Sequence, residues 1–229
     1  MSQGDCPPDS HERQKTEDNK THIMKIKTVI FDIGGVMVGL GRIRFFEQFG
    51  YAPKISEQVM NSTVKSRHWK ELDRGILTDE EVIDRFVKDA PELENEIRHC
   101  MENVHGIVYR LDTSIPWIRS LKDRDMQVLY LSNYSMKVAK DNEDAMDFLP
   151  YMDGGLLSCD YKVIKPDPAF YQILIDKYDL VPSECVFLDD LEANLETARQ
   201  LDIHTIRVKD HEQAKADLEK MLESRGQSL

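Results

Sequence analysis

The chain has 229 residues with 41% hydrophobic and 31% charged side chains, a composition typical of a globular protein with one large or two modest domains. Its net charge of −12 argues against a nucleic acid or an anionic membrane as partner, because phosphate groups bind basic surfaces. No stretch approaches the roughly 18 apolar residues of a spanning helix, and the four cysteines lack CxxC or disulfide-rich spacing, so we expect a reducing, cytoplasmic setting.

The first 23 residues differ in composition from the remainder of the chain. Residues 1–23 are rich in acidic, proline and polar residues and have no apolar core, which predicts a disordered tail and not a signal peptide. Met24 stands directly before the first strand signal, so the stretch is either a natural tail, a cloning remnant or a region upstream of the start. The apolar run 28–31 that follows predicts a buried strand, and it ends at Asp32.

Residues 41–106 carry helix signals and no strand signal. Phe45 and Phe49 lie on one apolar face at helical spacing. Thr78, followed three positions later by Glu81, predicts a capping box at the start of another helix. We expect a small all-helical domain that is inserted into the chain and covers one edge of the sheet as a cap.

Residues 24–40 and 107–229 are predicted to form the core domain, in which strands and helices alternate. The strand signals lie at 128–131, 154–158, 185–188 and 204–208. The helix signals lie at 114–123, from Pro166 to about Lys177, after Asp190, and in a last amphipathic stretch that ends at about Glu223. This alternation predicts an α/β fold, with a doubly wound parallel sheet and right-handed crossovers.

Three strand signals end at residues that can take part in phosphate chemistry. These residues are Asp32, Ser132 and the pair Asp189-Asp190. The carboxyl ends of parallel strands meet at one edge, where open α/β sheets bind ligands, so we expect them close together. Lys165 precedes a proline that we expect at the first position of a helix, where the helix dipole favours an anion.

These four motifs together resemble those of the haloacid dehalogenase-like hydrolase superfamily. The resemblance extends from about residue 27 to residue 209. One group of bacterial phosphatases, typified by α-D-glucose-1-phosphate phosphatase, is similar in its Asp-x-Gly first motif, in Leu131-Ser132-Asn133, and in the Arg74-Gly75 turn before the capped helix. The resemblance implies a core of the Rossmann-like type and a phosphatase that acts on a small phosphorylated metabolite.

The resemblance also implies a role for each motif residue. Asp32 would be the nucleophile that forms an aspartyl-phosphate, and Lys165 would pair with both the phosphoryl group and Asp32. The other phosphate-binding residues would be Ile33, Gly34, Ser132 and Asn133.

The acidic pair Asp189-Asp190 is best explained by Mg²⁺. Carboxylates about 4 Å apart repel each other by about 4 kcal/mol at an effective dielectric constant near 20, and a bound cation removes that repulsion. By resemblance the metal ligands would be Asp190, Asp189 directly or through water, Asp32, and the backbone carbonyl of Gly34. Asn194 would orient the Asp190 carboxylate.

One position departs from the pattern of the superfamily's phosphatases. They usually carry a second aspartate where this chain has Gly34, and that carboxylate protonates the leaving oxygen and then activates water. Its absence favours a substrate whose leaving group needs little protonation, such as a sugar 1-phosphate. The alternatives are a metal-free 2-haloacid dehalogenase and a non-catalytic phosphate-binding or scaffolding homologue. Substrate choice would depend on residues of the cap such as Arg42, Arg44 and Trp69.

Overall fold

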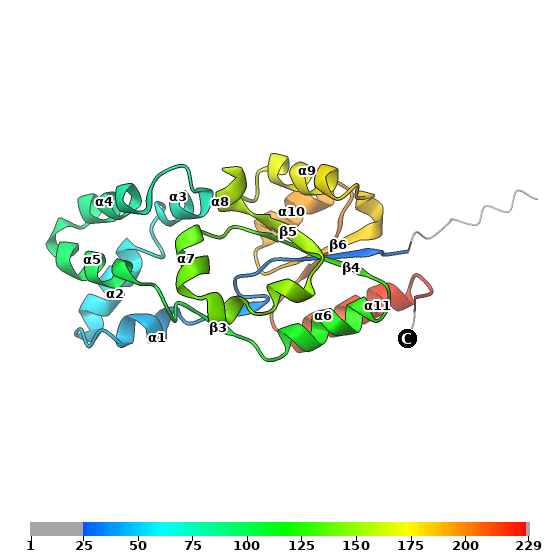
Figure 1. Ribbon diagram of the computed structural model, residues 1–229, viewed down its shortest axis with the longest axis horizontal. Coiled ribbons are helices and arrows are strands. Elements are labelled where there is room, and N and C mark those ends of the chain that lie inside the picture. Colours follow the sequence, from blue (N-terminus) through cyan, green and yellow to red (C-terminus); the bar gives the residue numbers. More distant parts are fainter. Residues whose placement is uncertain (1–24, 228–229) are drawn as a thin grey trace, which may run out of the picture.

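The central strand sends alternate side chains to the two faces of a sheet, and both sets are buried. In β1 (Thr28–Phe31), Val29 and Phe31 join one hydrophobic cluster and Ile30 joins a second. A strand that is apolar on both faces requires helices on both sides of its sheet. The computed structural model describes residues 25–227, and Figure 1 shows these two helical layers around the sheet. The tail predicted at residues 1–23 lies outside the described residues.

The sheet has five parallel strands in the order β5-β4-β1-β6-β7, so β1 lies at its centre. The other strands are β4 (Gln127–Ser132), β5 (Gly154–Leu157), β6 (Cys185–Asp189) and β7 (His204–Arg207). The chain adds strands outward from β1 in both directions, and the prediction of a doubly wound parallel sheet is therefore confirmed.

Two pairs of long helices cover the two faces. Helices α6 (Ser114–Lys122) and α11 (His211–Glu223) contribute to the first hydrophobic cluster, in which Phe31 meets Trp117 edge to face at 4.8 Å. Helices α9 (Pro168–Lys177) and α10 (Glu192–Gln200) contribute to the second. The remaining short helices of the core are α7 (Met136–Asp141), η2 (Glu143–Met146), η3 (Leu149–Tyr151), α8 (Ser158–Tyr161) and η4 (Pro182–Glu184).

Helix α9 begins two residues later than the sequence predicted. Its first residue is Pro168, and the Asp167 side chain caps it by accepting a hydrogen bond from the Ala169 N–H. An aspartate is a better N-cap than a lysine, and the first helical position again holds a proline. Lys165 therefore lies in the loop before the helix and not at its first turn.

The elements between residues 42 and 102 are all helical, and they lie together at one end of the molecule (Figure 1). They are α1 (Arg42–Glu47), α2 (Pro53–Ser62), α3 (Trp69–Arg74), α4 (Asp79–Asp89), η1 (Pro91–Leu93) and α5 (Glu94–Glu102). The expected capping box begins α4, because the Thr78 N–H donates to the Glu81 carboxylate at 2.8 Å and the Glu81 N–H donates to the Thr78 hydroxyl at 3.3 Å.

The structure contains a two-stranded ribbon that the sequence did not predict. Strand β2 (Val38–Leu40) pairs antiparallel with β3 (Val108–Arg110). Each strand has three residues and its partner lies about 70 positions away, so no local hydrophobic pattern reveals the pair. β2 leads from the sheet into the helical segment, and β3 leads from that segment back to the sheet. Their pairing therefore fixes the position of the helical segment relative to the sheet.

Candidate active site

The strand register brings the predicted site residues to one edge of the sheet. Phe31 pairs with Leu188, and the Asp32 N–H donates to the Leu188 carbonyl at 2.9 Å, so Asp32 lies beside Asp189. On the other side Phe31 pairs with Tyr130 of β4, the strand that ends at Ser132. Three strand ends thus deliver a carboxylate, a hydroxyl and a second carboxylate to neighbouring positions.

Asp32 is held by a hydroxyl and an ammonium group. The Ser132 hydroxyl donates to Asp32 Oδ1 at 2.7 Å, and Lys165 Nζ pairs with the same oxygen at 2.9 Å. Lys165 Nζ also pairs with Asp189 Oδ2 at 2.6 Å, and Lys165 is only 3% exposed. Charge-assisted hydrogen bonds in such a buried place are strong and orient their partners. Both contacts engage Oδ1, and among the described residues 25–227 no hydrogen bond or ion pair engages Asp32 Oδ2.

Asn133 positions the loop that carries Lys165. Its side-chain oxygen accepts from the Lys165 N–H at 2.7 Å, and its amide nitrogen donates to the Lys165 carbonyl at 2.9 Å. The loop before α9 is therefore anchored to the end of β4 through both peptide units that flank Lys165. Asn133 also lines the cavity described below.

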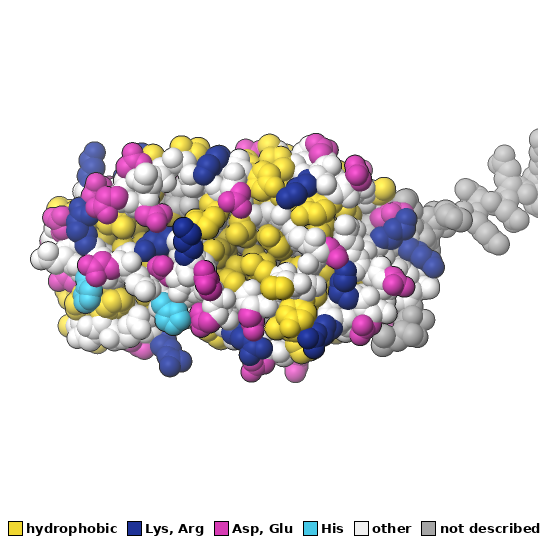
Figure 2. All heavy atoms as spheres, viewed as in Figure 1, with side chains coloured by type: hydrophobic (Ala, Val, Ile, Leu, Met, Phe, Trp, Pro, Cys, Tyr) yellow, Lys and Arg dark blue, Asp and Glu magenta, His cyan; other side chains and the backbone are white. Residues whose placement is uncertain are grey.

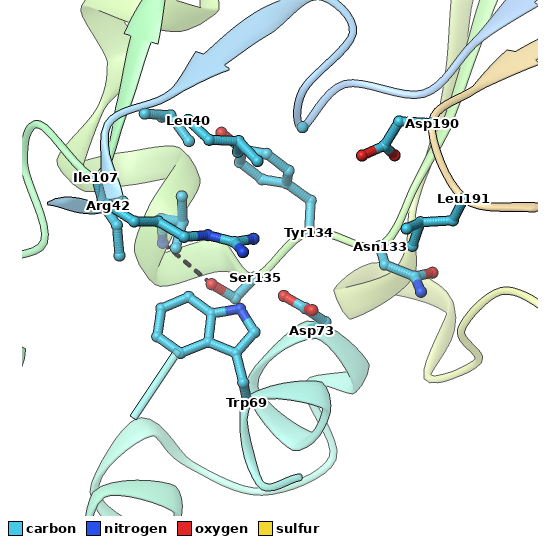
Figure 3. A pocket seen from close by; sticks show the side chains of 13 residues that line it. Leu40, Arg42, Trp69, Asp73, Ile107, Asn133, Tyr134, Ser135, Asp190 and Leu191 are labelled. Atoms are coloured by element: carbon cyan, nitrogen blue, oxygen red, sulfur yellow. Dashed lines mark hydrogen bonds between the residues drawn. The ribbon is translucent and has the colours of Figure 1, made fainter. Parts of the chain in front are cut away.

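The two adjacent carboxylates after β6 have different surroundings. Asp189 is fully buried and accepts from the Leu191 N–H at 2.8 Å and from the Asn194 amide on both oxygens, at 3.0 and 2.9 Å. The prediction that Asn194 orients Asp190 is wrong, because its amide binds Asp189 instead. Asp190 points into the cavity (Figure 3). Asp189 instead makes its contacts with Lys165 and Asn194 at the sheet edge.

The charges of the site shift the pKa values of its acids. Burial raises the pKa of Asp32 to about 6, with Asp189 adding to the effect and Lys165 and Ser132 opposing it. The pKa of Asp190 is also raised, first by burial and then by Asp189. Burial acts to lower the pKa of Lys165, but its two carboxylate partners outweigh that effect, and the net direction is upward. Lys165 therefore stays charged at neutral pH.

The site has the donor set of a divalent-cation site. Asp32, Asp189 and Asp190 each offer an oxygen, and these atoms lie within 4.8 Å of one another. One lysine does not neutralise three carboxylates, and hard oxygen donors suit Mg²⁺. Gly34 lies on the cavity wall next to this cluster. The residues present therefore fit a magnesium ion.

A cavity of about 290 Å³ lies between this edge and the helical segment (Figure 3). Its lining includes Arg42 and Trp69, two of the three candidates for substrate selection, whereas Arg44 lines a different hollow. The volume is close to the lower end of that of ligand pockets, which is roughly 300 Å³. The cavity therefore suits a small molecule.

Sequence reasoning missed one acidic residue of this cavity. Asp73, near the end of α3, directs its carboxyl into the space between Trp69 and Asn133 (Figure 3). Burial raises its pKa to about 7, with Asp32 as the next cause. The available signal was its place directly before the Arg74-Gly75 turn, but only the docking of α3 on the core shows where it points.

The surface carries both charged and hydrophobic side chains. In Figure 2, acidic and basic side chains are interspersed on the face shown, with hydrophobic side chains at its middle. Within residues 25–227, no helix combines the length and apolar character that a membrane crossing needs.

Comparisons with known proteins agree with this geometry. Acyl-CoA dehydrogenase family member 10 of Mus musculus is 27% identical over 206 residues, which is 86% of this chain but only 19% of that protein. D-ribitol-5-phosphate phosphatase of Bacteroides thetaiotaomicron is 26% identical over 195 residues, covering 80% of this chain and 91% of that enzyme.

A solved structure shares the fold. It is a HAD family enzyme of Bacteroides thetaiotaomicron in complex with magnesium and inorganic phosphate. It superposes with a TM-score of 0.59 at 23% identity, over 80% of this chain and 94% of that one. The model of the haloacid dehalogenase-like hydrolase family matches residues 26–202, and this chain therefore belongs to that family.

Proposed function

We propose that this hydrolase is a Mg²⁺-dependent phosphomonoesterase that acts on a small phosphorylated metabolite through an aspartyl-phosphate on Asp32. The observation that carries the proposal is the arrangement of three acids and one lysine at the sheet edge. One oxygen of Asp32 is held by Ser132 and Lys165, so the other is free to attack. Asp190 opens into the cavity within reach of Asp32.

Each residue of this edge would act on the phosphoryl group in a definite way. Asp32 attacks phosphorus as its ionised carboxylate, the form it takes above pH about 6. Lys165 and Ser132 hold the equatorial oxygens against the strand ends, helped by backbone N–H groups at Ile33, Gly34 and Asn133. A magnesium ion on Asp190, Asp189, Asp32 and the Gly34 carbonyl would neutralise phosphate charge. Asn194 would act indirectly, because its side-chain amide donates to the Asp189 carboxylate and holds it in place.

The cavity and the relatives both support a proposal for the substrate class. The cavity is small, and Arg42 and Trp69 offer a cation and an aromatic face to a polar ligand. The relative from Bacteroides thetaiotaomicron is a phosphatase of D-ribitol 5-phosphate. We therefore place sugar and polyol phosphates first. A sugar 1-phosphate is the specific substrate that Gly34, taken alone, favours, because its leaving hydroxyl is more acidic than an ordinary alcohol.

The two alternatives make different demands on the site. A metal-free dehalogenase has no use for the pair Asp189-Asp190, whose charges would only repel an incoming carboxylate. A phosphate-binding scaffold has no use for a nucleophile beside a buried lysine. The complete set of acids and lysine therefore favours the phosphatase.

The test is a phosphate-release assay on a panel that contains glucose 1-phosphate, glucose 6-phosphate, ribitol 5-phosphate and 4-nitrophenyl phosphate. The proposal predicts release that depends on Mg²⁺ and disappears with EDTA and in Asp32→Asn. Turnover of 2-chloropropionate without metal would favour the dehalogenase. Tight phosphate binding with no turnover on any substrate would favour the scaffold.

A further inference from the structure

The position that lacks a carboxylate has room for one. Gly34 does not have a positive φ, and a Cβ placed on it would meet only Leu40 Cδ2, at 3.9 Å, an ordinary contact. The neighbouring Gly35 is different, since its φ is +81° and a Cβ there would come within 3.3 Å of the Asp190 carboxylate. Steric constraints therefore require a glycine at position 35 but not at position 34. The space beside Gly34 is part of the cavity.

Asp73 supplies a carboxyl to the same cavity from the opposite wall. It lines the space together with Gly34 and Asp190, and its carboxyl points inward from α3 (Figure 3). Within residues 25–227, no hydrogen bond or ion pair engages this carboxyl group. Only its backbone carbonyl is bound, by the Ser158 hydroxyl. A carboxyl with this position is available to a ligand.

The end of α3 that carries Asp73 is fastened to the core. Ser158, which donates to the Asp73 carbonyl, itself accepts from the Tyr134 N–H at 2.9 Å. Lys162 Nζ donates to the Gly75 carbonyl at 2.6 Å. Gly75 has a φ of +66°, and a Cβ on it would lie 2.8 Å from the Cys159 carbonyl oxygen. This close packing on α8 fixes the carboxyl relative to the sheet edge.

We propose that Asp73 is the general acid and general base of the reaction, in place of the carboxylate that is missing at Gly34. The proposal rests on the phosphatase function proposed above. In the first step Asp32 bonds to phosphorus, the bond between phosphorus and the leaving oxygen breaks, and that oxygen takes the proton of the Asp73 carboxylic acid.

In the second step the roles are reversed. The Asp73 carboxylate takes a proton from water, and the water oxygen bonds to phosphorus. The bond between phosphorus and Asp32 breaks, which restores the Asp32 carboxylate, the Asp73 acid and free phosphate. The same group can do both because the alcohol leaves before water enters.

The charges around Asp73 allow both the protonated and the ionised form of its carboxyl group. Burial and the nearby Asp32 raise its pKa to about 7, while Arg42, Lys165 and Lys70 act to lower it. Asp190 also lines the cavity. An acid–base catalyst works best with a pKa near the operating pH, since both its forms are then populated.

This role changes the substrate preference that Gly34 alone would give. With Asp73 as acid, the wild-type enzyme also cleaves alkyl phosphates such as sugar 6-phosphates. The preference for acidic leaving groups then appears in full only when Asp73 is replaced.

The test compares Asp73→Asn with wild type on two substrates, ribitol 5-phosphate and 4-nitrophenyl phosphate. We expect kcat/KM to fall by about 10²–10⁴-fold for the alkyl phosphate and by less than about tenfold for the aryl phosphate, whose leaving group needs no proton. In wild type, kcat/KM for the alkyl phosphate should decline above pH about 7, and this decline should be absent in the variant. Glu71→Gln, which removes a charge from the same helix outside the cavity, should match wild type.

A second variant guards against a merely structural effect. Gly34→Asp in the Asp73→Asn background should restore at least about tenfold of the lost alkyl-phosphate activity, because it returns a carboxyl to the cavity. Equal losses on both substrates, or no loss on either, would overturn the role of Asp73 and leave the phosphatase function standing. A wild-type protein that hydrolyses neither substrate would overturn both.

Discussion

Replacing Asp73 with asparagine should stabilise the fold at neutral and alkaline pH but not in acid. Burial raises the pKa of this carboxyl from 3.8 to about 7. Between these values the folded protein binds a proton that the unfolded chain releases, so stability falls as the pH rises through that window. At about 1.4 kcal/mol per pKa unit, the cost above pH 7 is at most about 4 kcal/mol. Asparagine has nearly the same shape and carries no charge, so it avoids this cost.

The assay is urea unfolding, followed by circular dichroism, of wild type and Asp73→Asn at several pH values between 4.5 and 8. The difference in free energy of unfolding should be smallest at pH 4.5 and grow by up to about 3 kcal/mol toward pH 8. Asp123→Asn, at the exposed end of α6, is the matched control for the same substitution on the surface. A pH-independent effect of Asp73→Asn would show that this carboxyl is well solvated, and the reasoning about its pKa would be wrong.

Four further variants test the sheet-edge site and the cavity. Asp32→Asn should abolish turnover with unchanged folding, and more than a few per cent of residual kcat would contradict the nucleophile assignment. Asp190→Ala should raise the Mg²⁺ concentration for half-maximal activity, and an unchanged metal titration would refute its role as ligand. Asn194→Ala should destabilise the fold by about 1–3 kcal/mol, because Asp189 loses a buried donor, and an unchanged urea midpoint would contradict this. Trp69→Ala should raise KM with a smaller stability loss than the roughly 3–5 kcal/mol of a core tryptophan, and thermal unfolding beside the kinetics separates the two.

The parallel sheet could be predicted because its signals are local. A four-residue apolar run such as Val128–Leu131 indicates a buried strand in the sequence, and it forms one in the structure. The residue that follows such a run lies at the carboxyl edge of the sheet. Asp32, Ser132 and Asp189 meet there for that reason. The capping box at Thr78 was readable because both partners lie within one turn.

The parts that the sequence did not predict depend on contacts between distant segments. The β2–β3 ribbon is one example, since neither strand has a pattern of its own. Asn194 is another: its spacing from Asp190 suggested that partner, but the turn after β6 points Asp189 toward α10 instead. Asp73 reaches the cavity only because α3 is fastened to α8. These distinctions are set by side-chain direction, which periodicity alone does not determine.

The most direct test of the account is to look for the phosphorylated enzyme. Wild-type protein is mixed with 4-nitrophenyl phosphate and Mg²⁺, quenched in acid within milliseconds, digested and examined by mass spectrometry. The account predicts one added phosphoryl group on the peptide that contains Asp32, which is absent in Asp32→Asn and persists longer in Asp73→Asn because no base activates water. Phosphate release with no modified peptide at any quench time, or a phosphoryl group on another residue, would contradict it.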